Sequence, residues 1–299
     1  MQPTALIPRA LDSFDQAASA VIDAKRSEAT RKAYRIDLRR WVLFCAEHRL
    51  EPTTPSIMAT TAFRDELRKK VSEETARRTI AALSSIYGTL LKGRIVTANP
   101  FHPALLAWPV ASKIGKTRRV DDDVARAMIL NAIADDSPSG PRDAAILRLL
   151  YDTGLRRESV VTISRKQYQP PSLRTVIKGG EQVEVDLPEQ TVTAIDRWLD
   201  VAPSSVYLFP GRDRGAHIDV GLVNKIVAAR ALAVGAEHIH PHCFRAAFAT
   251  AGYDAQLPEY EIQAGMHHKD PSTTRRYDRG VRGNTTAIKI AEHRRKKSR

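Results

Sequence analysis

Apolar residues recur at helical spacing along the first third of the chain. Between Ser27, a preferred N-cap residue, and a break at 53–55, the apolar positions fall on one helical face. These positions are Tyr34, Leu38, Trp41, Val42 and Cys45. The same spacing predicts three further helices, over 11–24, 58–70 and 73–92. We therefore expect a small helical domain over residues 11–107.

After residue 120 the pattern alternates between helical and strand-like spacing. Helices are predicted over 121–134 and from Pro141 to Gly154. Three short β-like runs follow, at 166–169, 173–177 and 183–187, and a hairpin tip joins the last two. Helices return over 191–200, 220–233, 242–253, 258–266, from Asp270 and over 284–299. The chain is therefore expected to be mainly α-helical with a small antiparallel β-sheet.

A proline-rich stretch separates these two patterns. Residues 99–115 contain Pro100, Pro103 and Pro109 and show no hydrophobic period. We predict a linker over 108–119, a first domain over 1–107 and a second domain over 120–299.

The chain is strongly basic, with a formal net charge of +13 over 299 residues. Both halves are positive, as expected if both contact one polyanion such as DNA. Basic side chains follow the polar faces of the second and fourth predicted helices and the end of the linker. The candidate DNA contacts are Arg31, Lys32, Arg35, Arg39, Arg77, Arg78, Lys116, Arg118 and Arg119. The alternative is that these are ordinary solvated faces.

Cysteine use and hydropathy argue against several classes of protein. Cys45 and Cys243 are far apart and form no CxxC pair, so a disulfide framework or a zinc ribbon is not expected. The sequence has no apolar run of about 18 residues that would predict a membrane span. The N-terminus has no signal-peptide pattern. We expect a cytoplasmic protein of bacterial or phage origin.

Tyr277 is the candidate centre of chemistry. It lies on a short segment that begins at Asp270, an N-cap residue followed by proline. His268 precedes this segment, and His242 and Arg245 are one helical turn apart, so they share a face. A phenol with cationic and hydrogen-bonding groups suits phosphoryl transfer to tyrosine. The alternative is that Tyr277, one of eight tyrosines, serves only packing.

Four segments of the second domain occur in a fixed order. They are LLYDTGLRRESV, VIKGGEQVEVDLP, HPHCFRAAFATA and HHKDPSTTRRY. In these segments and their order, the chain resembles the tyrosine recombinases of the simple two-domain type, which are also called phage integrases. The resemblance implies a SAM-like core-binding domain, then a catalytic domain with a tail at 284–299. In the family this tail docks on a neighbouring subunit, and contact with DNA is the alternative.

The resemblance implies roles for six residues. They are the arginines Arg156 and Arg245, the hairpin lysine Lys178, the histidines His242 and His268, and the nucleophile Tyr277. Such an enzyme cuts and rejoins DNA through a 3′-phosphotyrosine intermediate and exchanges strands through a Holliday junction. The resemblance also implies a homotetramer on double-stranded DNA with inverted binding sites, accessory proteins in some cases, and no metal or other cofactor.

Elementary chemistry agrees with these roles. A phenol has a pKa near ~10, so at neutral pH it needs a base, for which His242 or Lys178 is available. Two forked guanidinium groups suit the oxygens of the phosphate, and a lysine can protonate the departing 5′-oxygen. His268 is expected to add a hydrogen bond to the phosphate.

The sequence departs from the family pattern at three points. His267 precedes His268 where many members have glycine, so two histidines compete for one role. Ala246 replaces a frequent histidine after the second arginine. Ser159 stands where an acidic residue is usual, with Glu158 one residue earlier, which leaves the acidic supporting role open.

Three other functions compete with the recombinase. A type IB topoisomerase shares the chemistry but relaxes DNA without exchanging sites. A metal enzyme could use His238, His240, His242, His267 and His268, but no HExxH motif or acidic triad accompanies them. A non-catalytic DNA-binding protein would be marked by the loss of one of the six residues, and none is lost.

Overall fold

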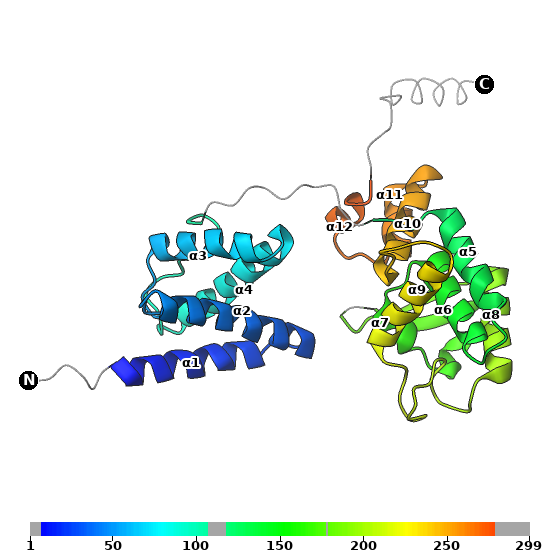
Figure 1. Ribbon diagram of the computed structural model, residues 1–299, viewed down its shortest axis with the longest axis horizontal. Coiled ribbons are helices and arrows are strands. Elements are labelled where there is room, and N and C mark those ends of the chain that lie inside the picture. The colour runs from blue at the N-terminus through cyan, green and yellow to red at the C-terminus, as the bar shows by residue number, and fades with distance from the viewer. Residues whose placement is uncertain (1–6, 107–117, 178, 279–299) are drawn as a thin grey trace, which may run out of the picture. The chain divides into compact units, whose positions relative to one another are not determined.

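The computed structural model describes residues 7–106, 118–177 and 179–278, with side chains from residue 14 onward (Figure 1). The chain divides into two compact units, Met1–Ala111 and Ser112–Arg299. The predicted positions Lys116 and Lys178 and the tail 284–299 lie outside the described residues. The functional division into 1–107, 108–119 and 120–299 stays a prediction.

The first unit is a group of helices that agree closely with the predicted ones. They are α1 (Ile7–Asp23), α2 (Glu28–Glu47), α3 (Ile57–Lys70) and α4 (Glu73–Lys92). The hydroxyl groups of Ser27, Ser56 and Ser72 accept hydrogen bonds from backbone N–H groups in the first turns of α2, α3 and α4. These N-caps are local, which is why the sequence predicts where the helices begin.

An aromatic cluster forms the core of the first unit. Trp41 is fully buried and lies edge-on to Phe63 and Phe101. Its indole N–H donates to the Tyr87 hydroxyl at 2.7 Å, and that hydroxyl donates to the Pro52 carbonyl at 2.6 Å. The buried polar groups of these large side chains are therefore satisfied within the core.

The second unit is mainly helical and holds the small sheet. Its first helices are α5 (Asp122–Ile133), α6 (Gly140–Thr153) and the short α7 (Arg157–Val161). Its strands are β1 (Tyr168–Gln169), β2 (Ser172–Val176) and β3 (Gln182–Asp186). The later helices are α8 (Glu189–Val201), α9 (Val220–Ala233), α10 (Pro241–Asp254), α11 (Glu259–Gly265) and α12 (Pro271–Arg275).

Helix α6 lies at the centre of this unit, against α5, α8, α9 and α10 (Figure 1). Its side chains Ile146, Leu147, Leu149 and Leu150 are fully buried, so it is apolar on nearly all sides. The antiparallel sheet has the order β1-β2-β3, with Leu173 opposite Val185. The predicted fold class, mainly α with a small antiparallel sheet, is confirmed.

The structure differs from the sequence prediction in two short segments. Helix α7 was not predicted, because five residues are too few to show a helical period. The predicted run 166–169 forms a strand only at its end, since Arg165–Gln167 is a 3₁₀ turn closed by a capping box between Ser164 and Gln167. Among the described residues, no helix has the length and apolar character needed to cross a membrane.

Candidate active site

Gly154 shapes the turn that presents Arg156. It ends α6 with a φ of 60°, a left-handed conformation that favours glycine. A Cβ atom at this position would lie 2.7 Å from Cδ1 of Phe248 on α10, so the turn also packs too closely for a side chain. Arg156 then stands at the N-cap position of α7, directly after this fixed turn.

Arg245 lies on α10 and connects three segments that are distant in sequence. Its side chain is buried and donates hydrogen bonds to the backbone carbonyls of Gly154 and Met266. Its Nη2 atom also lies 2.9 Å from Nε2 of His268. Its Nε atom is buried and has no hydrogen-bond partner among the described residues. The guanidinium group is thus held by protein on one side and keeps an unused donor.

His268 is the histidine that joins the cluster. It is only 7% exposed, and its Nδ1 atom lies 2.9 Å from the hydroxyl oxygen of Thr274 on α12. Its ring is nearly parallel to that of Tyr277, at 8° with the ring centroids 6.2 Å apart. The neighbouring His267 has a φ of 49°, and its buried Nε2 atom has no hydrogen-bond partner among the described residues. Geometry therefore separates the two histidines that the sequence could not.

The phenol ring of Tyr277 contacts both His242 and His268. Its oxygen is 3.3 Å from Nε2 of His242, which extends from the first turn of α10. Tyr277 follows α12 directly, and its backbone N–H donates to the carbonyl of Thr274 at 3.0 Å. Asp270 begins this short helix with a side chain that accepts from the backbone N–H of Ser272 at 2.9 Å, as the sequence predicted. Four predicted residues, His242, Arg245, His268 and Tyr277, therefore form one cluster.

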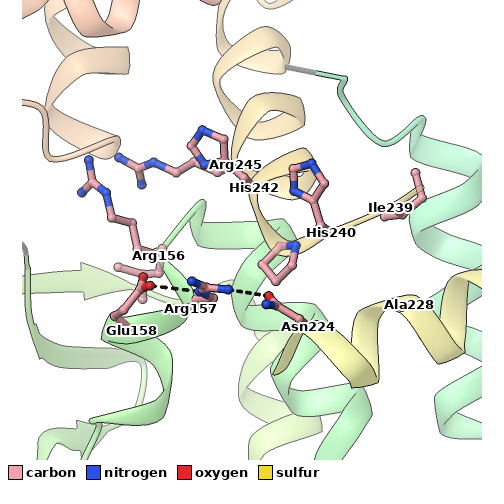
Figure 2. Close-up of a pocket in the computed structure, with 11 residues that line it drawn as sticks. Arg156, Arg157, Glu158, Asn224, Ala228, Ile239, His240, His242 and Arg245 are labelled. Atoms are coloured by element: carbon pink, nitrogen blue, oxygen red, sulfur yellow. Dashed lines mark hydrogen bonds and ion pairs between the residues drawn. The ribbon is translucent and has the colours of Figure 1, made fainter. Parts of the chain in front are cut away.

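An open pocket of about 540 Å³ lies beside this cluster (Figure 2). Arg156, His242 and Arg245 line it, and their polar groups gather on the same side of the pocket in Figure 2. On the opposite wall Arg157 donates to Asn224 of α9 at 2.7 Å and forms an ion pair with Glu158 at 2.9 Å. The pocket is therefore lined by several fixed cations.

His242 and His268 are neutral at physiological pH. Burial, with the charges of Arg245 and Arg156, lowers the pKa of His268 to about 3. Burial and Arg245 also lower the pKa of His242. Desolvation and the charge of Arg156 lower the pKa of Arg245 to about 10, so its guanidinium stays protonated. The site thus combines two cations with neutral imidazoles, an environment that favours an anion.

Ser159 does not fill the acidic supporting role that the sequence left unassigned. That side chain is buried, and its hydroxyl donates to the carbonyl of Val176 at 2.8 Å, tying α7 to β2. Glu158 is exposed and pairs with Arg157. Among the described residues, no three histidine, cysteine, aspartate or glutamate side chains converge as metal ligands.

Sequence reasoning missed the partners that hold the site together. Thr274 contacts His268, and Asn224 contacts Arg157. Neither their residue types nor their spacing in the sequence distinguishes these two from polar residues that face solvent. Thr274 lies within the segment HHKDPSTTRRY, so its location was a weak signal, but its contact depends on the tertiary fold.

Comparison with known proteins decides the family. Residues 118–281 match the phage integrase family, and residues 19–93 match the phage integrase N-terminal SAM-like domain. The chain belongs to the phage integrase family. The first match covers more than half of the chain and includes the residues Arg156, His242, Arg245, His268 and Tyr277.

Curated relatives of the chain include Xer recombinases. The chain is 30% identical to tyrosine recombinase XerC of Xanthomonas campestris pv. campestris (strain B100), covering 86% of this chain and 80% of that protein. It is 26% identical to tyrosine recombinase XerD of Shewanella oneidensis, covering 89% of this chain and 91% of that protein. The protein is a tyrosine-type site-specific DNA recombinase, and the alternative of a type IB topoisomerase is not favoured.

Solved structures share the fold of this chain at low sequence identity. XerH recombinase bound to difH substrate in a pre-cleavage complex matches with a TM-score of 0.69 and 14% identity, covering 88% of this chain and 78% of that chain. A lambda integrase dimer bound to a COC′ core site matches with a TM-score of 0.69 and 15% identity, covering 91% of this chain and 97% of that chain. These likenesses support the fold class.

The predicted DNA-contacting residues of the integrase differ in their surroundings. Arg35 pairs with Asp23, Arg77 with Glu73, and Arg119 with Asp121 and Asp254. The guanidinium of Arg31 donates to the carbonyl of Lys25, and that of Arg118 to the carbonyl of Glu237. Lys32 and Arg39 are exposed on α2. Among the described members of the set, only these two have side chains that make no ion pair or hydrogen bond within the protein.

Arg78 has a structural partner that the sequence did not reveal. Both of its terminal nitrogens contact the carboxylate of Asp37, at 2.5 and 2.9 Å, and Asp37 is fully buried. Thr79 and Arg40 complete the contacts of that carboxylate. Because a buried carboxylate needs such partners, Arg78 has a clear role in stabilising α2 against α4.

Proposed function

We propose that Tyr277 is the nucleophile that cleaves a DNA strand in this recombinase. The single observation that carries the proposal is the position of its phenol oxygen, 3.3 Å from Nε2 of His242 and beside the buried Arg245. The oxygen attacks the scissile phosphorus, the bond between phosphorus and the 5′-oxygen breaks, and a 3′-phosphotyrosine bond forms.

His242 is proposed to take the phenolic proton. A phenol with a pKa near ~10 is a weak nucleophile at neutral pH until a base assists it. Because burial and Arg245 lower the pKa of His242, its imidazole is neutral and its Nε2 can accept a proton. The departing 5′-oxygen needs a proton in turn, and Lys178, which lies outside the described residues, is proposed to supply it.

Arg156 and Arg245 are proposed to bind the non-bridging oxygens of the phosphate. Both line the pocket next to Tyr277. The unpartnered Nε of Arg245 supports this role, because a buried donor without a partner costs about 1–3 kcal/mol and a phosphate oxygen would satisfy it. His268 is proposed to act beside them, through its contact with Arg245. The cations that this chemistry needs are side chains, so no metal or other cofactor is proposed.

Strand exchange is proposed to occur in a homotetramer on double-stranded DNA with inverted binding sites, through a Holliday junction, with accessory proteins as further partners. Residues 1–107 would bind the core site, 108–119 would link the domains, and 120–299 would carry the chemistry. The relatives that were solved with DNA, XerH and lambda integrase, support the choice of partner. The proposed compartment is the bacterial cytoplasm, where that DNA lies.

Replacement of the phenol oxygen tests the nucleophile. Tyr277→Phe should form no covalent adduct on a nicked suicide substrate while binding the same DNA about as well as the wild type. The matched control is Tyr260→Phe, because Tyr260 is 69% exposed and bonds to Glu261. The cognate site is first located by footprinting across the DNA beside the gene, and adducts are resolved on denaturing gels in EDTA.

The outcomes of this assay are distinct. An adduct formed by Tyr277→Phe would assign the nucleophile to another tyrosine. Loss of wild-type cleavage in EDTA, with recovery on added magnesium, would reinstate a metal-dependent mechanism.

A further inference from the structure

Hydrogen-bond chemistry determines the tautomer of His268. Arg245 is a donor only, so the contact of 2.9 Å between its Nη2 and the Nε2 of His268 requires a lone pair on that ring nitrogen. The imidazole is neutral, because burial and two arginines lower its pKa to about 3. Its single ring proton must therefore be on Nδ1, the atom that lies 2.9 Å from the hydroxyl oxygen of Thr274.

This tautomer changes the part that His268 was expected to play. In the expected role the ring donates a hydrogen bond to the phosphate, yet its Nε2 here accepts from Arg245. The ring instead supports the guanidinium group, together with the carbonyls of Gly154 and Met266. Nη1 donates to Gly154, and Nη2 uses both of its donors, one on Met266 and one on His268. These contacts orient Arg245, and its Nε–H has no protein partner among the described residues.

Thr274 is placed to act through His268. It is fully buried, and α12, on which it lies, leads directly to Tyr277. Its backbone carbonyl accepts the N–H of Tyr277 at 3.0 Å, while its hydroxyl faces the imidazole. The backbone of His268 is held separately, since the Gln263 side chain donates to its carbonyl at 2.9 Å. The ring orientation therefore depends on Thr274 rather than on the loop alone.

We propose that Thr274 is a positioning residue for strand cleavage, whose hydroxyl oxygen holds His268 in the tautomer that accepts from Arg245. The chain of contacts runs from the helix of the nucleophile, through Thr274 and His268, to the phosphate-binding arginine. When α12 packs at the site, it therefore places Tyr277 there and, through Thr274 and His268, also orients Arg245. This inference rests on the proposed roles of Tyr277 and Arg245.

Two substitutions separate this role from simple packing. Thr274→Val keeps the branched shape but removes the acceptor, whereas Thr274→Ser keeps the acceptor and removes a methyl group. The matched control is Thr273→Val on the same helix, because Thr273 is only half-buried. At metal sites, replacing the residue that holds a functional imidazole typically lowers activity by about tenfold to a hundredfold. We expect a loss of cleavage rate of that size in Thr274→Val.

The kinetic test is single-turnover adduct formation on a nicked site, with DNA binding measured in parallel. Thr274→Val should cleave about tenfold to a hundredfold more slowly at unchanged DNA affinity. Thr274→Ser should restore most of the rate, and Thr273→Val should behave as the wild type. Equal rates for Thr274→Val and the control, or a Thr274→Ser variant as slow as Thr274→Val, would overturn the proposal.

A spectroscopic test does not depend on cleavage or on the stability of a variant. Long-range ¹H–¹⁵N spectra of the DNA-free full-length protein with labelled histidine report the protonated ring nitrogen of each imidazole. The His268 signals are assigned by their loss in His268→Gln. We expect a protonated Nδ1 in the wild type, and a protonated Nε2 would overturn the proposal. Failure of Tyr277 as nucleophile would instead appear as an adduct in Tyr277→Phe.

Discussion

Arg245 contacts three groups of the second unit through its guanidinium. It holds the carbonyls of Gly154 and Met266 and the ring of His268 while keeping a donor unused. A planar guanidinium can satisfy this many acceptors at fixed angles, whereas an ammonium is a compact charge with three donors. At the residue scale, the identity of this cation should therefore matter more than its charge.

Arg245→Lys should lose strand cleavage by about 10²–10³-fold, the usual effect of removing one preorganised donor. The matched control is Arg148→Lys, since Arg148 pairs with Asp152 on α6, away from the site. Single-turnover cleavage and DNA affinity are measured for both variants. Cleavage by Arg245→Lys at a rate near that of the control would show that the forked geometry is not required.

The site is assembled at the ends of three helices. Arg156 follows the C-terminal turn of α6, His242 and Arg245 lie in the first turns of α10, and Tyr277 follows α12. Isolated helices of 14 residues or fewer are marginally stable in water, so tertiary packing must hold their ends. The close approach of Gly154 to Phe248 is one such point, because it brings the end of α6 against α10.

Gly154→Ala should destabilise the second unit by about 2–4 kcal/mol, from left-handed strain and overlap with Phe248. That corresponds to a fall in melting temperature of roughly 5–15 °C. The control is Gly235→Ala, because Gly235 has a φ of 73° with no atom near its missing Cβ. It should show only the strain, about 1–2 kcal/mol. Equal melting temperatures for the two variants would mean that Phe248 yields without cost.

At the scale of the whole molecule, charge is expected to govern the affinity of the chain for DNA. The net charge of +13 is spread over both halves of the chain, but many basic side chains are already paired within the protein. Counterion release makes affinity depend on the phosphates neutralised, so only cations that reach DNA contribute to the salt slope. Exposed residues such as Lys32 and Arg39 are therefore expected to matter more than Arg78.

Replacing both Lys32 and Arg39 by glutamine should make the slope of log affinity against log salt shallower, by about 0.9 for each phosphate that is no longer neutralised. Arg78→Gln should instead lower the melting temperature, because the buried Asp37 loses its bidentate partner. Binding is measured over a salt series with full-length protein. An unchanged slope in the double variant would identify the face of α2 as an ordinary solvated surface.

The sequence by itself determined the fold class, most of the elements and the family. Ser27, Ser56, Ser72 and Asp270 are caps that act within one helical turn, so helix starts can be predicted from neighbouring residues. The order of the four segments indicated the family. It also indicated Tyr277 as nucleophile, a role that remains a proposal.

Only the tertiary structure decided which groups meet. His267 and His268 are adjacent and chemically alike, but only His268 contacts Arg245, whereas the buried Nε2 of His267 has no hydrogen-bond partner among the described residues. The bond from Arg245 to Gly154, the hydroxyl of Thr274 on His268 and the hold of Arg78 on Asp37 join separate elements. Such contacts follow from packing between helices, and hydrophobic period or local capping carries no information about them.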